Sequence, residues 1–173
     1  IKQDGKLIII LDFEKIVSDI NPETGLKMAD LAELGVRTRN DIPILIAEDS
    51  PLLNKLIVDS LRQAGYENLT HTENGQEAYD IIEHYRDEGT IEDNVKCVIT
   101  DIEMPLMDGH RLTKLIKDDE RTKHIPVVIF SSLVNAEMKR KGESLGADAQ
   151  LSKPEIGNLV KTVDKLVLDN SAD

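Results

Sequence analysis

The stretch VKCVITDIEMPLMDG, residues 95–109, decides the fold of this chain. Its first half is apolar and rich in β-branched residues, which is typical of a buried strand, and the run ends abruptly at Asp101. Proline, aspartate and glycine soon follow, so a turn is expected before the next helix. Ligands of parallel α/β sheets bind at the carboxyl ends of the strands, which makes Asp101 the first functional candidate. Taken alone, an aspartate at this place is about as often a turn former or helix cap as a reactive group.

Composition is that of an ordinary globular protein and narrows the choice of partners. The chain has 173 residues, of which 40% are hydrophobic and 31% charged, enough for a proper core. With 33 acidic and 21 basic residues the formal net charge is −12, so we expect no binding to nucleic acid. No apolar run approaches the roughly 20 residues of a membrane-spanning helix, and we expect no membrane insertion. The single cysteine, Cys97, fits a reducing compartment and is expected to be a small core residue.

From Ile42 onward, strand-like and helix-like segments alternate. Strands of the buried type are predicted at residues 44–47, 95–100 and 125–130, a weaker strand at 66–72 and a short one at 149–151. An amphipathic helix follows each of them. Five strand–helix pairs joined by short loops predict an α/β protein with a parallel sheet, helices on both faces and right-handed crossovers. The acidic stretch at residues 86–94 is expected to be a solvated loop.

Polar residues end four of these strands, namely Glu48 with Asp49, Asp101, Ser131 and Lys153. Because parallel strands share one direction, these side chains should meet at one edge of the sheet. Three clustered carboxylates need a cation, and hard oxygen ligands suit Mg2+. The hydroxyl of Ser131 and the ammonium of Lys153 can bind phosphoryl oxygens. Together they predict a phosphoryl-transfer site with a carboxylate nucleophile.

Each member also has a plain structural interpretation. The acidic pair can begin a helix, Ser131 can form a turn or cap, and Lys153 can be a solvated surface residue. The joint occurrence at four strand ends favours the functional interpretation.

At these residues the chain resembles response-regulator receiver domains. The matching motifs are EDSP at residues 48–51, DIEMP and DG at 101–105 and 108–109, SS at 131–132 and KP at 153–154. The resemblance implies a flavodoxin-like (βα)5 doubly wound sheet of strand order 2-1-3-4-5, with residues 42–173 as the receiver domain. It also implies that Asp101 takes a phosphoryl group from a histidine kinase, held by Ser131 and Lys153. Mg2+ would be bound by the side chains of Glu48, Asp49 and Asp101 and by the backbone carbonyl of Glu103. A receiver assists its own phosphorylation and dephosphorylation and is otherwise not an enzyme.

Residues 1–41 sharpen the choice of subfamily. DGKL at residues 4–7, LDFEKI at 11–16 and NPETG at 21–25 resemble the end of a CheW-like coupling domain, so residues 1–41 are interpreted as its C-terminal stub plus a linker. A coupling domain followed by a receiver is the arrangement of the CheV family of chemotaxis coupling proteins. That resemblance implies the kinase CheA and the chemoreceptor array as partners, in the cytoplasm at polar receptor arrays. Because the chain begins with Ile1, we expect it to be part of something longer.

Many receivers carry an aromatic residue three positions before the lysine, and its rotation accompanies movement of the hydroxyl residue. In this chain that position is Gln150, so the Ser131–Gln150 switch is expected to work differently.

Two alternatives of the same chemistry are the receiver of a transcriptional response regulator and an aspartyl-phosphate phosphohydrolase. The hydrolase would need an aspartate where the chain has Glu103. A Rossmann-type nucleotide binder would need a glycine-rich turn where the chain has residues 48–51.

Overall fold

A computed structural model describes residues 2–3, 6–7, 38–132, 135–153 and 155–168. Of the N-terminal 37 residues only two short strands are described, β1 (Lys2–Gln3) and β2 (Lys6–Leu7), which pair antiparallel. The helices expected in this segment lie outside the described residues. Its interpretation as a CheW-like stub therefore stays a prediction.

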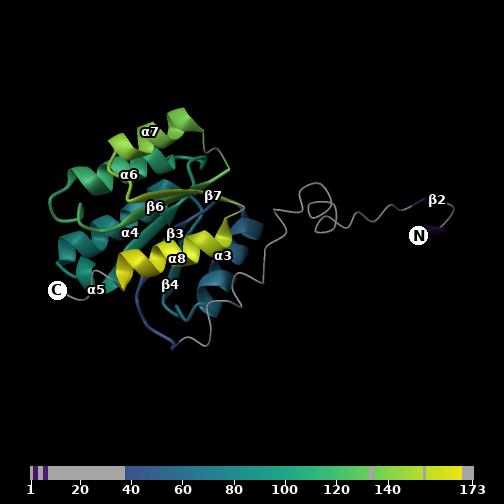
Figure 1. Ribbon diagram of the computed structural model, residues 1–173, viewed down its shortest axis with the longest axis horizontal. Helices are drawn as coiled ribbons and strands as arrows, with labels where there is room; N and C mark the ends of the chain where they lie inside the picture. Colours follow the sequence, from purple (N-terminus) through teal and green to yellow (C-terminus); the bar gives the residue numbers. More distant parts are fainter. Residues whose placement is uncertain (1, 4–5, 8–37, 133–134, 154, 169–173) are drawn as a thin grey trace.

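Five parallel strands form the central sheet (Figure 1). They are β3 (Ile44–Ala47), β4 (Leu69–Thr72), β5 (Cys97–Thr100), β6 (Val127–Ser131) and β7 (Ala149–Ser152). Their spatial order is β4-β3-β5-β6-β7, which is the predicted order 2-1-3-4-5. Ala47 is in register with both Thr72 and Thr100, and Ser131 is in register with Ser152. The carboxyl ends of neighbouring strands therefore lie level, and the flavodoxin-like fold is confirmed.

Helices cover both faces of the sheet (Figure 1). One face packs against α3 (Pro51–Gln63) and α8 (Ile156–Val167), and the other against α4 (Gly75–Glu88), α5 (Ile91–Asn94) and α6 (Gly109–Asp118). Helix α7 (Ala136–Ser144) lies beside α6 and β7. Within β3, Ile44 and Ile46 enter the first core while Leu45 and Ala47 enter the second. A strand covered on both faces must be apolar throughout, which explains the unbroken run. No helix in the described part of the chain is long and apolar enough to span a membrane.

Four helices begin at the carboxyl edge with a side-chain cap. Ser50 accepts a hydrogen bond from the Leu53 backbone N–H, and Asn74, Asp108 and Asn135 cap α4, α6 and α7 in the same way. These caps satisfy orphan N–H groups and start each helix immediately after its strand or loop. The partial positive charge of four helix N-termini is consequently placed at the edge where the acidic residues gather.

The prediction of a solvated loop at residues 86–94 is wrong. Helix α4 continues to Glu88 and ends at Gly89, whose φ of 73° is the left-handed conformation that glycine adopts readily. Residues 91–94 then form α5, which buries Ile91 in the second core. The extra length between the acidic pair and Asp101 is thus folded structure.

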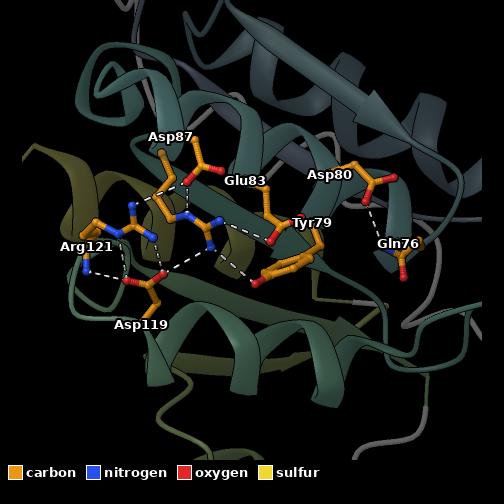
Figure 2. A network of polar contacts seen from close by, with 8 residues as sticks. Gln76, Tyr79, Asp80, Glu83, Asp87, Asp119 and Arg121 are labelled. Carbon is orange, nitrogen blue, oxygen red and sulfur yellow. Dashed lines mark hydrogen bonds and ion pairs between the residues drawn. The ribbon is translucent and has the colours of Figure 1, made fainter.

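Arg86 is the centre of a polar network at the end of α4. Figure 2 shows its partners Glu83, Asp87 and Asp119. The Arg86 side chain is only 10% exposed and pairs with Glu83 at 3.2 Å, Asp87 at 2.9 Å and Asp119 at 3.1 Å. Arg121 joins the same two aspartates, at 3.4 Å to Asp87 and 3.3 Å to Asp119. The network ties the end of α4 to the segment that follows α6.

We expect Arg86→Met to lower the free energy of unfolding by about 2 kcal/mol, because charged hydrogen bonds to three carboxylates are lost together. Urea unfolding followed by circular dichroism measures the change. Arg140→Met, at an exposed position of α7, is the control and should change stability by less than about 0.5 kcal/mol. Equal effects of the two substitutions would contradict a stabilising role for the network.

Candidate functional site

Backbone hydrogen bonds extend the strand ladder by one residue and bring the predicted site residues together. The N–H of Asp101 donates to the Ala47 carbonyl at 3.0 Å, and the N–H of Lys153 donates to the Ser131 carbonyl at 3.2 Å. Glu48 is held in the same way, because its N–H donates to the Thr72 carbonyl at 3.1 Å. Residues just past the ends of three strands are therefore as firmly placed as the strands themselves.

Lys153 lies between two buried carboxylates. Its Nζ is 2.6 Å from Oδ2 of Asp101 and 3.1 Å from Oε2 of Glu48. The side chains of Lys153, Asp101 and Glu48 are only 9%, 6% and 1% exposed. Ser131 is buried at the end of β6, whereas Asp49 is exposed to solvent. An ion pair withdrawn from water in this way is strongly coupled, and loss of either partner leaves an uncompensated charge.

Backbone N–H groups orient both carboxylates. The Ile102 N–H donates to Oδ1 of Asp101 at 2.6 Å, and the Ser50 N–H donates to Oε1 of Glu48 at 3.1 Å. These donors were missed by sequence reasoning, since every residue except proline carries the same group and only the turn geometry directs it. Lys153 then donates to the second oxygen of Asp101, Oδ2, and shares Oε1 of Glu48 with Ser50 at 3.3 Å.

The two buried charges perturb each other. Burial raises the pKa of the Glu48 carboxyl above its ordinary value, and the Lys153 ammonium offsets this only in part. Burial acts to lower the pKa of Lys153, but its hydrogen bond and charge interaction with Asp101, and a smaller interaction with Glu48, hold that pKa above its ordinary value. Lys153 is therefore a fixed cation of the site at neutral pH.

The donor set fits a divalent metal ion. One carboxylate oxygen from each of Glu48, Asp49 and Asp101 lies within 4.8 Å of the others. Oε2 of Glu48 is buried and makes no hydrogen bond, so it has an unused lone pair beside its ion pair with Lys153. An all-oxygen, partly open site of this kind suits Mg2+, which keeps several waters. Glu103 is exposed in the loop after β5, and the ligand role of its backbone carbonyl stays a prediction.

Gly109 closes the loop that carries Asp101. Its N–H donates to the Ile102 carbonyl at 3.0 Å, and a Cβ at this position would lie 1.9 Å from the Asp101 carbonyl oxygen. The start of α6 therefore packs directly on the backbone of Asp101. In the sequence, Asp108-Gly109 was recognised as a turn signal and as one of the receiver motifs, but its packing on Asp101 was not, because a contact between backbones leaves no pattern in the chain.

Gln150 links β7 to α7. Its Nε2 donates to the Lys139 carbonyl at 2.6 Å, and its amide fills the space over Gly142, where a Cβ would lie 2.5 Å from Oε1. At the position where the resemblance implied an aromatic ring, the chain thus has a side chain hydrogen-bonded to a helix. A switch of Ser131 and Gln150 stays a prediction.

This fold and this cluster of residues define the class of protein. The family model of the response regulator receiver domain matches residues 44–164, and the chain belongs to that family. Among solved structures, a putative response regulator from Chloroflexus aurantiacus superimposes with a TM-score of 0.65 at 25% identity, covering 75% of this chain and 99% of that one.

Among curated proteins, the chain is similar to a group of chemotaxis proteins. It is 35% identical over 160 residues to the chemotaxis protein CheV2 of Helicobacter pylori, a match that covers 88% of this chain. It is also 29% identical over 127 residues to the polar-differentiation response regulator DivK of Brucella anthropi, covering 73% of this chain and 96% of DivK. The chain spans about half the length of the CheV proteins it matches, 47% of CheV2, 50% of CheV1 and 54% of CheV3.

We expect Gly109→Ala to lower the free energy of unfolding by about 3 kcal/mol, because the added Cβ displaces α6 or Asp101. Gly89→Ala is the matched comparison: a Cβ there meets no atom within 4 Å, and only its φ of +73° is unfavourable. That variant should cost about 1 kcal/mol. Urea unfolding of both proteins gives the two values, and an equal loss would show that overlap at Asp101 is not the cause.

Proposed function

We propose that this chain is the phosphoacceptor part of a chemotaxis coupling protein of the CheV type. In this proposal Asp101 receives a phosphoryl group from a phosphohistidine of the kinase CheA. The observation that supports it most directly is Lys153, which reaches from the end of β7 to within 2.6 Å of Asp101 while also pairing with Glu48. A cation and an adjacent acidic set around one buried carboxylate suit transfer of an anionic group.

The proposed step is an in-line displacement. A carboxylate oxygen of Asp101 attacks phosphorus, an acyl phosphate bond forms, and the bond from phosphorus to the histidine nitrogen breaks. The imidazole leaves with the bonding pair of electrons and takes a proton from solvent. Lys153 pairs with one oxygen of the transferred group, and the Ser131 hydroxyl donates to another.

A bound Mg2+ supplies positive charge for the phosphoryl oxygens as charge builds up on them. Glu48, Asp49 and Asp101 are the side chains that would hold it, with the Glu103 carbonyl as the further ligand from the protein. Lys153 alone leaves the three carboxylates with net negative charge, so a bound cation would reduce their repulsion of an anionic donor.

The output in this proposal is a shift between two packings. Phosphorylation draws Ser131 toward the acyl phosphate and changes the contacts of α7, which Gln150 joins to β7. The partners are CheA and the chemoreceptor array, in the cytoplasm at the cell pole, by analogy with the CheV relatives. The chain acts as a signalling domain and not as an enzyme on free phosphate esters.

Beryllofluoride, which imitates an aspartyl phosphate, gives the first test. We expect wild type to bind it by isothermal titration calorimetry only with Mg2+ present, and Asp101→Asn to lose binding because a neutral amide replaces the carboxylate that would bind the beryllium. Asp59→Asn, an exposed carboxylate of α3, is the control and should bind as wild type does. Absence of binding in wild type, or equal binding by Asp101→Asn, would overturn Asp101 as the acceptor.

Phosphotransfer tests the donor and the class of activity. Incubation with phosphorylated CheA of the same organism should add one phosphoryl group to wild type by mass spectrometry and none to Asp101→Asn. Phosphorylation by phosphoramidate without phosphorylation by CheA would keep the receiver chemistry and reject the chemotaxis kinase. Sustained hydrolysis of p-nitrophenyl phosphate would instead favour the phosphohydrolase alternative.

A further inference from the structure

The chain enters the receiver domain along a fixed path. The N–H of Asn40 donates to the Gly65 carbonyl at 2.8 Å, and the Asn40 carbonyl accepts from the N–H of Glu67 at 3.1 Å. Thr38 lies against the same turn, since a Cβ on Gly65 would be 2.7 Å from the Thr38 carbonyl oxygen. These residues belong to the expected linker, but their backbone is paired with the turn that follows α3. From Thr38 onward the linker is therefore not a flexible tether.

A hollow of about 560 Å³ opens beside this entry point. Its lining consists of Thr38, Arg39, Asn40, Ala64, Asp164 and Leu168. Because Asn40 precedes β3 and Ala64 follows α3, the hollow lies at the amino edge of the sheet, away from Asp101. Leu168, at the end of α8, is 46% exposed and is one of three exposed large apolar side chains in the described part of the chain. An exposed leucine in a hollow is a surface on which an apolar partner can pack.

The residues just before this hollow carry an apolar stripe. Met28, Leu31 and Ala32 recur at helical spacing and Gly35 is a helix stop, so the sequence predicts an amphipathic helix over residues 26–35. This segment lies outside the described residues. Isolated helices shorter than about 12 residues are marginal in water, so the stripe needs a surface to pack against.

Covalent geometry restricts where that surface can be. A chain spans at most about 3.6 Å per residue, so Gly35 lies within about 11 Å of Thr38. Thr38 is itself part of the lining of the hollow. The end of the predicted helix is therefore held next to the hollow at a high effective concentration, which a separate molecule would have to match by its own affinity.

We propose that residues 26–35 dock in this hollow, with their apolar stripe against Leu168. The contact holds the part of the chain before residue 26 in a set orientation relative to the receiver domain, instead of leaving the two parts joined by a flexible linker. The inference does not depend on phosphorylation of Asp101, which lies at the other edge of the sheet.

Disulfide trapping in the full chain tests the contact and the face that makes it. Leu31→Cys with Leu168→Cys places one thiol on the stripe and one in the hollow. Asp30→Cys with Leu168→Cys is the matched control, because Asp30 lies on the side of the predicted helix opposite to the stripe. Cys97 does not interfere, since burial raises the pKa of its thiol to about 12. We expect the stripe pair to form its intramolecular disulfide at least about tenfold faster than the control pair, by mass spectrometry of the monomer.

Hydrogen exchange tests the same contact with a single substitution. The backbone amides of residues 26–35 should be protected in wild type and should exchange about tenfold faster in Leu168→Asn, because the apolar contact is lost. Leu106→Asn is the control: it removes a leucine that is 81% exposed in the loop after β5, at the other edge of the sheet. It should leave this protection unchanged, and the amides of α8 should stay protected in both variants.

Three results would overturn the docking of this segment. The first is equal rates of disulfide formation in the two cysteine pairs. The second is exchange of residues 26–35 that is as fast in wild type as in an unfolded peptide, or that is unaffected by Leu168→Asn. The third is formation of disulfide-linked dimers in place of monomers, which would show that a second copy of the chain occupies the hollow.

Discussion

The ion pair between Lys153 and Asp101 is the constraint on which the site depends. It joins the ends of β5 and β7, two strands separated in the sheet by β6. The pair can form because the parallel register keeps the strand ends level. Both side chains are buried, so each charge needs the other to compensate for its loss of hydration. Glu48 adds a second carboxylate, 3.1 Å from the same ammonium. Because these charges are shielded from water, they also interact strongly with a charged ligand.

The pattern of strands in the sequence was sufficient to predict the order of the sheet and the position of most residues of the site. The apolar runs are long because β3, β5 and β6 are covered on both faces, and each ends at a polar residue that the ladder carries into the site. The convergence of Glu48, Asp101, Ser131 and Lys153 therefore followed from strand direction alone. Asp49 was also placed correctly in the acidic cluster, although it is exposed.

Features that depend on contacts between distant residues were not visible in the sequence. Residues 86–94 have the charge pattern of a solvated loop, but Arg86 meets Asp119 across 33 positions, and Ile91 reaches the core. The orienting N–H groups of Ser50 and Ile102 and the contact of Gly109 with Asp101 are backbone geometry, which residue types do not encode locally. The positive φ of Leu106, +62°, belongs to the same group, because only the folded loop fixes it.

The contact of Gln150 with Gly142 has a consequence for how this receiver can vary. The amide occupies volume that exists only because residue 142 lacks a Cβ, and it is held there by one hydrogen bond to α7. A larger residue at 142 expels the amide, and a ring at 150 needs that volume in another shape. The two positions are therefore coupled: a Cβ at 142 moves the amide of Gln150 away from its hydrogen bond to α7, so the effects of changes at 142 and 150 will not add.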